Sequence, residues 1–370
     1  MKIEPYSSVP RHEWDGVCES SSLAWLFHRA AWIDIEERFF VRSNHSIALR
    51  LSDRCIGVLP LYLSDSAAGT GGERLLHSGI HRHTGLALVK GLDPPTAKAA
   101  RSAAMRSVLT LAEKLDADRV QLNSQNLAPQ NLSPARREIP FWVEDYSFYL
   151  GLQIGQDGMV PAPGMATCNA DQIVELSSSE EEMFRRLDNR QNVRKAQAAG
   201  VTFEAGDATS CVDDYYAIAK KSAVRTREKL PPSDYYRAIW QALGAVDRCA
   251  MLFACKEGVR VAGLLLAIDK GAASFLAGAS DPEYLPLRVN DFLHWSAMVW
   301  AARKGLARYR LGPVFPELPD SWAVSKVSAF KNKFGARSVT TIQGSYFRRP
   351  EKYLGAAAAH LRLLCAKRPG

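Results

Sequence analysis

The sequence predicts a mixed α+β chain with two tandem domains, each built on a central, mostly antiparallel sheet flanked by helices. Its 370 residues and 47% hydrophobic content are sufficient for two ordinary cores. In residues 249–279, three apolar strand patterns are joined by Glu257-Gly258 and Lys270-Gly271, which are typical of the tight turns of an antiparallel meander. Helix, strand, helix and strand patterns follow this meander, and the first half shows a looser version of the same order.

The first domain is expected over residues 1–155. Two helical patterns, at residues 10–16 and Arg29–Phe40, precede an alternating hairpin pattern over residues 46–63. Further along, Lys98–Leu115 predicts an amphipathic helix and Arg119–Asn123 a strand. The Gly-, Pro- and polar-rich residues 156–171 are expected to be a linker.

The second domain is expected over residues 172–370. Ser177–Ser179 and the acidic run Glu180–Glu182 are typical of a helix start, and Gly200 is the expected end of that helix. Gly335 directly follows the helical pattern Trp322–Lys333, where glycine commonly forms a left-handed cap. The other patterns predict helices at Asp213–Arg227, Ser233–Leu243, Arg288–Lys304 and Tyr353–Cys365, and strands at Gln172–Leu176, Arg308–Leu311 and Val339–Gln343.

Composition indicates the cellular compartment. No apolar run approaches the length of a membrane span, and the N-terminal stretch lacks the apolar core of a secretory signal. The seven cysteines are odd in number and scattered, which fits a reducing compartment. Cys249 and Cys255 are expected to be buried thiols in strands. We therefore expect a cytoplasmic protein.

The net charge of +8 is unevenly distributed along the chain. Residues 1–170 carry 17 Lys and Arg against 18 Asp and Glu, whereas residues 171–370 carry 30 against 21. This basic second half suits a polyanionic partner, either a nucleic acid or the phosphates of CoA or a nucleotide. A solvated basic surface without a partner is the alternative interpretation.

Three stretches of the second half resemble the FemABX-like family of the GNAT superfamily. Residues 329–335, "AFKNKFG", are similar to the FK-x-x-F-G signature near the C-terminus of that family. Residues 176–204 resemble the family's entry into its second domain, and residues 275–312 resemble its strand–helix–strand segment. The family commonly has Y-D-L/F-G at the end of that segment, where this chain has Tyr309-Arg310-Leu311-Gly312.

The resemblance implies two GNAT-type domains and a transferase that moves an amino acid from aminoacyl-tRNA to an amine of a small molecule. That acceptor would be a peptidoglycan precursor or a specialised metabolite, received mainly by the first domain, and the basic second domain would bind the tRNA. The resemblance also implies that Phe330 and Lys331 lie beside the aminoacyl end of the donor. A cation there stabilises the oxyanion that forms during acyl transfer. From the helical pattern alone, a surface lysine is the competing interpretation of Lys331, with Trp322, Val327, Phe330 and Phe334 on an apolar side.

Two other functions remain open from the sequence. One is an N-acyltransferase that uses acyl-CoA or an acyl-carrier protein, although residues 286–295, "PLRVNDFLHW", lack the glycines with which GNAT enzymes hold a pyrophosphate. The other is a non-catalytic RNA-binding module, although no RRM, KH or OB signature is present. A covalent route is disfavoured, since the chain has no G-x-S-x-G elbow and no recognisable catalytic cysteine.

Basic residues near two helices are candidates for contacts with the donor or its tRNA. Arg190 and Arg194 are four residues apart and share a helix face, with Lys195 adjacent. Complementing a helix C-terminus is the alternative role for these three residues. The further candidates around the FK pair are Lys326, Lys333 and Arg337.

Acids and histidines supply the remaining candidates. Asp291 and His294 are candidates for the proton acceptor, and Asp291 is equally consistent with helix capping. His77, His81 and His83 are candidates for contacts with the acceptor, with a metal site or a purely structural role as alternatives. No acid or cysteine lies within residues 75–91, which argues against metal binding. We expect neither a metal nor a cofactor.

Overall fold

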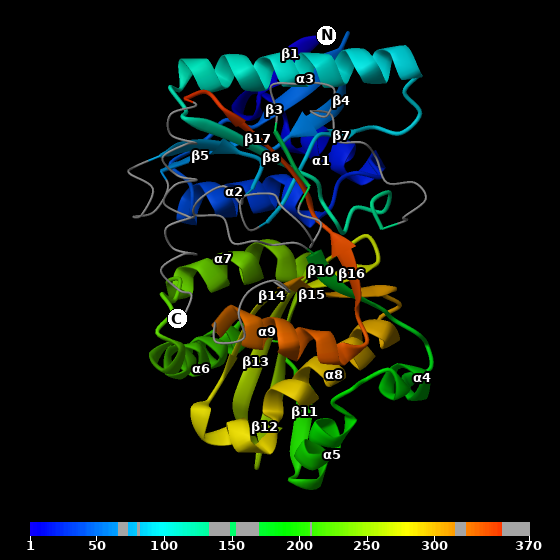
Figure 1. Cartoon of the computed structure of the whole chain (residues 1–370), viewed down its shortest axis with the longest axis vertical. Coiled ribbons are helices and arrows are strands. Elements are labelled where there is room, and N and C mark those ends of the chain that lie inside the picture. The colour runs from blue at the N-terminus through cyan, green and yellow to red at the C-terminus, as the bar shows by residue number, and fades with distance from the viewer. Residues whose placement is uncertain are drawn as a thin grey trace, which may run out of the picture. The chain divides into compact units, whose positions relative to one another are not determined.

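The computed structural model describes residues 1–65, 73–79, 82–132, 149–152, 170–207, 209–314 and 323–349 (Figure 1). The chain forms two compact units, one from Met1–Ala170 with Thr340–Gly370 and one from Asp171–Val339. The sequence assigned everything after residue 171 to the second domain, but the strand β17 (Ile342–Phe347) pairs with strands of the first unit. The predicted helix Tyr353–Cys365 and most of the predicted linker lie outside the described residues. Within the described part, every helix is too short or too polar to cross a bilayer.

The first unit contains two sheets, a four-stranded one in the order β1-β3-β4-β7 and a six-stranded one in the order β2-β5-β6-β8-β17-β9. Within the six-stranded sheet, β6 and β8 are parallel, whereas β17 is antiparallel to both β8 and β9. Its elements before the second unit are β1 (Lys2–Pro5), η1 (Tyr6–Ser8), α1 (Arg11–Ser20), η2 (Leu26–His28), α2 (Ala30–Phe39), β2 (Ser43–Asn44), β3 (Ile47–Leu51), β4 (Arg54–Leu59), β5 (Tyr62–Asp65), β6 (Arg74–His77), β7 (Ala87–Leu88), α3 (Pro94–Lys114), β8 (Arg119–Asn123) and β9 (Tyr149–Leu152).

The predicted hairpin over residues 46–63 passes from one sheet to the other. β3 and β4 pair in the four-stranded sheet, and β5 then continues in the six-stranded sheet. Pro60, which has no N–H to donate to a ladder, lies between β4 and β5. The next backbone N–H, that of Leu61, donates instead to Ser46 Oγ at 3.0 Å. The strand therefore ends at the proline, and the sheet divides there.

Helix α3 is the longest helix of the described chain (cyan in Figure 1). Its start is capped by Asp93, whose carboxylate accepts from the Thr96 N–H at 2.8 Å, and prolines occupy its first positions. Its buried face consists mainly of alanines, so the helix backbone lies close to the core. This helix connects β7 to β8.

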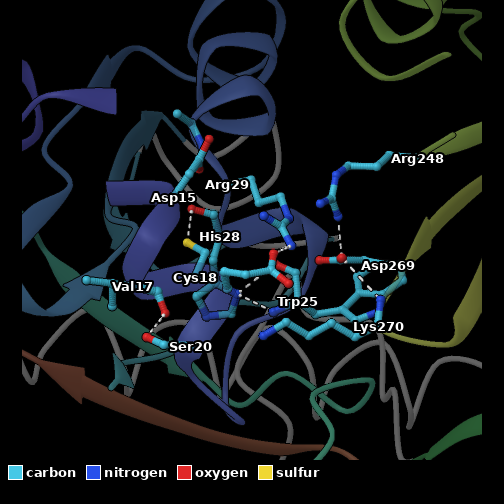
Figure 2. Close-up of polar contacts among 12 residues, drawn as sticks. Asp15, Val17, Cys18, Ser20, Trp25, His28, Arg29, Arg248, Asp269 and Lys270 are labelled. Atoms are coloured by element: carbon cyan, nitrogen blue, oxygen red, sulfur yellow. Dashed lines mark hydrogen bonds and ion pairs between the residues drawn. The ribbon is translucent and has the colours of Figure 1, made fainter. Parts of the chain in front are cut away.

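A buried histidine joins two loops of the first unit. His28 is fully buried, and its ring nitrogens lie 3.2 Å from the backbone nitrogens of Trp25 and Gly85. The thiol of Cys18 donates to the His28 carbonyl at 3.4 Å (Figure 2). These contacts hold the segment between α1 and α2 against the segment before β7.

The second unit has one seven-stranded sheet in the order β11-β12-β13-β14-β15-β10-β16. The strands β12, β13 and β14 form the predicted antiparallel meander, and β15 runs parallel to β14. Its elements are β10 (Ala170–Glu175), α4 (Glu180–Arg185), α5 (Arg190–Ala198), β11 (Val201–Ala205), α6 (Ser210–Thr226), α7 (Ser233–Leu243), η4 (Gly244–Val246), β12 (Cys249–Lys256), β13 (Val259–Asp269), β14 (Ala272–Ser280), η5 (Pro282–Leu287), α8 (Val289–Arg303), β15 (Arg308–Val314), α9 (Ala323–Lys331), η6 (Asn332–Phe334) and β16 (Arg337–Thr340).

The meander has the predicted two-residue turns. Glu257-Gly258 and Lys270-Gly271 all have positive φ, as the twist of a hairpin requires. Arg248, just before β12, forms an ion pair with Asp269 at the end of β13, and the same carboxylate accepts from the Lys270 N–H at 3.1 Å (Figure 2). These contacts close the end of the meander near its second turn.

Helices cover both faces of the meander. α8 packs on β12, β13 and β14, whereas α6 lies on the opposite face, where Tyr215 sits over Gly263 (Figure 1). The order β14, α8, β15, with the two strands parallel, resembles β6, α3 and β8 of the first unit. The predicted fold class, with two mixed α/β units of mainly antiparallel strands flanked by helices, is confirmed.

Candidate active site

The three stretches that carry the family resemblance meet around the end of helix α9. Lys331 is the last residue of α9, and its Nζ donates a hydrogen bond of 2.7 Å to the carbonyl of Pro313 in β15. Beside it, Gly312 has a φ of +94°, and a Cβ there would lie 3.3 Å from Lys331 Nζ. Gly335 has the predicted left-handed conformation (φ +66°), and a Cβ there would lie 2.9 Å from the carbonyl oxygen of Arg186. Residues far apart in the chain are thus adjacent in the second unit.

Lys331 is a buried residue, with 9% of its surface exposed, and is not a surface lysine. Among residues 325–331 of α9, the buried ones are Ser325, Ser328 and Lys331, at intervals of three residues. Val327, which was expected on an apolar side, is 49% exposed, so that expectation is wrong. Trp322 lies outside the described residues. Since serine side chains are short, α9 lies close to β15, and the long Lys331 side chain reaches the end of that strand.

A buried ammonium group is stable only when acceptors surround its hydrogens. The Pro313 carbonyl supplies one such acceptor. A cation is therefore held at the carboxyl end of β15, in a low-dielectric environment where its field acts strongly on any negative charge that develops nearby.

Phe330 anchors the end of α9 to helix α8. Its ring lies 5.2 Å from that of Phe334 and 5.6 Å from that of His294, between centroids. Phe334 is fully buried and Phe330 packs partly buried against the same core. Because the adjacent residue is Lys331, this aromatic packing also orients the lysine.

The two candidates for a proton acceptor are both engaged inside the unit. His294 is buried, its Nδ1 lies 3.0 Å from the Tyr309 hydroxyl, and burial together with the Lys331 charge lowers its pKa to about 3. The ring is therefore neutral at physiological pH and a very weak base. Asp291 is buried and accepts from the amides of Asn189 at 2.7 Å and Asn192 at 3.1 Å, which joins α8 to α5. This geometry favours structural roles for both residues.

The helix predicted to run from Ser177 to Gly200 is two helices, α4 and α5. The break lies at residues 186–189, where the Asp188 N–H donates to the Lys333 carbonyl at 2.9 Å. Arg190 is consequently the first residue of α5, away from the helix end at which it was expected. The tertiary hydrogen bond replaces a helical one, so the sequence pattern did not reveal the break.

The predicted donor-binding cations fall into two groups. Arg194 lies over the Phe184 ring, at 5.4 Å from its centroid, Arg190 donates to the Arg185 carbonyl, and Arg337 forms an ion pair with Glu175. The others are exposed and have no acidic partner in the part of the chain that the structure describes; they are Lys195, Lys326 and Lys333. This second group therefore presents exposed cations whose charges are not paired with a carboxylate of the described chain.

A buried ion pair occupies the position where the related family commonly has an aspartate. Arg310 in β15 pairs with Asp171 in β10 at 2.5 Å and donates to Ser274 Oγ of β14 at 3.3 Å. Both charged side chains are less than a tenth exposed. This arginine therefore links three neighbouring strands of the sheet that carries Gly312 and Pro313.

The histidine segment of the first unit is only partly described, since His81 lies outside the described residues. His77 is buried, its Nε2 lies 2.9 Å from Ser64 Oγ, and its Nδ1 accepts from the Gly79 N–H at 3.1 Å. His83 is half-buried, and its carbonyl accepts from the Gln125 amide. The ring of His77 therefore has a structural role. Among the described residues, no group of His, Cys, Asp and Glu has the arrangement of a metal site.

Cys249 and Cys255 are buried thiols, as predicted. Burial raises the pKa of Cys249 to about 12, and burial together with the Glu204 carboxylate raises that of Cys255 to about 11. Neither thiol forms a thiolate at neutral pH, which argues against either as a nucleophile.

Comparisons with known proteins agree with this architecture. Residues 184–319 match the acetyltransferase (GNAT) domain family. The matched residues lie within the second unit. A search of curated proteins by sequence finds no match.

Solved structures extend the likeness over nearly the whole chain. The crystal structure of FemX matches with a TM-score of 0.68 and 16% identity, covering 96% of this chain and 100% of that one. A tandem GNAT protein from the clavulanic acid biosynthesis pathway matches with a TM-score of 0.51 and 13% identity, over 93% and 97% of the two chains. L-PGS from Bacillus licheniformis matches with a TM-score of 0.55 and 11% identity, over 97% of each. The expected FemABX-like, tandem GNAT fold is thereby confirmed, and the GNAT match supports an acyltransferase.

Sequence reasoning missed two features of this site. Gly312 lies directly beside Lys331, and Asp171 neutralises Arg310. Neither charge stood out in the sequence, because the strand of Asp171 also contains Glu175 and the strand of Arg310 also contains Arg308. The contact between Gly312 and Lys331 had no local signal either, since it depends on how α9 packs on β15.

Proposed function

We propose that this protein is an aminoacyl-tRNA-dependent transferase that forms an amide bond between an aminoacyl group and an amine of a small molecule. The observation that carries the proposal is the buried Lys331 ammonium group at the carboxyl end of β15. Lys331 is a cation positioned by packing, and Gly312 beside it adds no side chain. Its role is to stabilise the oxyanion of the tetrahedral intermediate.

The proposed reaction balances without a covalent enzyme intermediate. The acceptor amine attacks the aminoacyl ester carbon, the new C–N bond forms, and the C–O bond to the tRNA ribose breaks. The amine loses one proton, and the departing ribose oxygen gains one. Lys331 keeps its protons throughout, because its task is electrostatic. The buried, protonated thiols of Cys249 and Cys255 fit this direct route.

The charges of the second unit favour a large polyanionic donor. Lys195, Lys326 and Lys333 are exposed, and phosphate contacts of this kind contribute most of the affinity for nucleic acids. We assign the donor to the second unit and the small-molecule acceptor, a peptidoglycan precursor or a specialised metabolite, to the first. The reaction belongs in the cytoplasm, where aminoacyl-tRNA is made.

An acyl-CoA-dependent N-acyltransferase is the second candidate, and the match to the acetyltransferase (GNAT) domain favours it. Arg288, directly before α8, has a φ of +62°, so the left-handed turn expected of a glycine is present without one. The first turn of α8, however, carries the buried carboxylate of Asp291. A negative charge near a helix N-terminus opposes the binding of a pyrophosphate there, which places this candidate second.

One assay separates the two donors. The purified chain is incubated with a low-molecular-mass cell extract and either tRNA charged with radiolabelled amino acids or radiolabelled acetyl-CoA. The proposal expects label to pass from the charged tRNA to a small product, and ribonuclease treatment of the tRNA beforehand to abolish the transfer. Transfer from acetyl-CoA that is insensitive to ribonuclease contradicts it and selects the second candidate.

Substitution of the lysine tests the proposed chemistry. Lys331→Met keeps the length of the side chain and removes the charge, so kcat is expected to fall about 100-fold or more, as for the loss of one oxyanion donor. Lys229→Met is the matched control, because Lys229 is exposed and lies in a loop of the same unit. Equal activity of the two variants, with equal melting temperatures, refutes the role of Lys331.

A further inference from the structure

A cavity in the first unit is separate from the Lys331 site, which belongs to the second unit. Its volume is about 680 Å³, within the range of small-molecule sites. It lies between α3 and the residues of β1, η1 and the β2–β3 connection. The proposed function places the acceptor in the first unit without assigning it to this cavity.

The walls of this cavity combine apolar and polar residues. Ile3 and Ile47, from the paired strands β1 and β3, contribute apolar surface. α3 contributes residues at helical spacing, Ala103, Ser107 and Thr110, so one face of the helix lines the cavity. Ala103 and Ser107 are small, which leaves the space open.

One arginine, Arg106, and one acid, Glu37, line the cavity. This arginine is exposed on α3, lines the cavity, and has no acidic partner in the part of the chain that the structure describes. The acid that lines the cavity, Glu37, accepts a hydrogen bond of 3.1 Å from the Asn44 amide. His45 also lines the cavity, but burial lowers the pKa of its ring. The ring Nε2 lies 2.8 Å from the Ser43 hydroxyl.

Arg106 is therefore a cation without an acidic partner beside an apolar surface and two helix hydroxyls. A guanidinium group binds a carboxylate or phosphate through paired N–H donors, and Ser107 and Thr110 supply further donors on the same helix face. A neutral ligand would leave this cation without a partner, and a cationic ligand would be repelled by it. Among anionic, neutral and cationic ligands, an anionic ligand therefore fits Arg106 best.

We propose that this cavity is a binding site for a small molecule that has an apolar body and one anionic group. The apolar body lies against Ile3 and Ile47, and the anionic group binds Arg106. The inference does not rest on the proposed role of Lys331, which lies in the other unit.

A matched set of ligands tests the proposal on the full chain. Octanoate, octanol and octylamine have the same apolar chain and differ only in the charge of the polar end. Isothermal titration is expected to show octanoate binding about tenfold more tightly than octanol, because a charge-assisted hydrogen bond is replaced by a neutral one. Octylamine is expected to bind most weakly of the three.

Three substitutions on α3 locate the binding. Arg106→Gln is expected to remove the preference for octanoate over octanol, and Ala103→Trp, which fills the cavity, to abolish the binding of both. Lys98→Gln is the control, because Lys98 is an exposed cation of the same helix that does not line the cavity. Should Ala103→Trp fail to fold, as judged by its melting curve, Ser107→Phe fills the same space. The proposal is overturned by absence of octanoate binding, by equal affinities for octanoate and octanol, or by binding that survives the filled cavity.

Discussion

The Arg310–Asp171 ion pair gives the sharpest prediction for the stability of the second unit. Asp171→Asn keeps the shape of the side chain and removes its charge. Arg310 is then left as an uncompensated cation in a site where it is only 8% exposed. Within the described residues, its guanidinium then keeps a hydrogen bond of 3.3 Å to the Ser274 hydroxyl, a neutral acceptor.

The size of the effect follows from burial and distance. Two unit charges about 4 Å apart interact by about 4 kcal/mol at the effective dielectric constant typical of proteins. Removing one partner of a buried pair costs about 3–5 kcal/mol, because the other charge stays desolvated. For a unit of this size, about 2–4 °C is lost per kcal/mol, so the melting temperature of the second unit should fall by about 10 °C.

Urea unfolding with a double-mutant cycle measures the pair directly. Asp171→Leu combined with Arg310→Met removes both charges and is expected to recover most of the loss, with a coupling energy of at least about 2 kcal/mol. Glu181→Gln is the control, because the Glu181–Arg185 pair is largely exposed, and it should leave the unfolding midpoint nearly unchanged. If Asp171→Asn behaves like this control, or if the two substitutions in the pair are additive, the reasoning is wrong.

The other predictions concern the surroundings of Lys331. Burial lowers the pKa of His294 from 6.5 to about 3, so below pH 6.5 the unfolded chain binds a proton that the folded chain does not. As the pH falls from 6.5, the free energy of unfolding should therefore decrease by up to about 1.4 kcal/mol per pH unit. Urea titrations of a His294→Gln variant should lack this part of the slope. Gly335→Ala places a Cβ on a left-handed backbone (φ +66°) and 2.9 Å from the Arg186 carbonyl, so it should lower the free energy of unfolding by at least about 2 kcal/mol. Gly258→Ala has the same backbone strain but open space around its Cβ, so its loss should be clearly smaller, and equal losses would contradict the prediction. Asn189→Ala removes a 2.7 Å hydrogen bond from a buried carboxylate and should cost about 1–3 kcal/mol in the same unfolding assay, whereas no loss would show that water replaces the amide.

Local chemistry made much of the fold predictable. The two meander turns and the Gly335 cap were correct because a glycine at positive φ is a strong and local requirement. The break between α4 and α5 was not predictable, since the Asp188 N–H bonds to Lys333, which is remote in sequence. The return of β17 to the first unit was missed for the same reason, because its partners β8 and β9 precede it by a whole domain.

The same distinction between local patterns and tertiary packing applies to the candidate site. The resemblance directed attention to Lys331, whereas the helical pattern alone placed the exposed Val327 in the core. Burial of a face made of two serines and a lysine contradicts the rule that apolar residues face inward, and only the packing on β15 explains it. Arg337 was predicted as a donor contact, but its pairing with Glu175 depends on β10 and β16 being neighbours in the sheet, which the sequence did not reveal.

The position of β17 has a consequence for synthesis of the chain. The six-stranded sheet of the first unit receives β17 between β8 and β9 only after residues 342–347 have been translated. Asp171–Val339 precedes β17 in the chain, so it leaves the ribosome before β17 does and can fold first. We therefore expect the nascent chain to complete its second unit before its first, and a released fragment that ends before residue 342 to protect the second unit, but not β8, from protease.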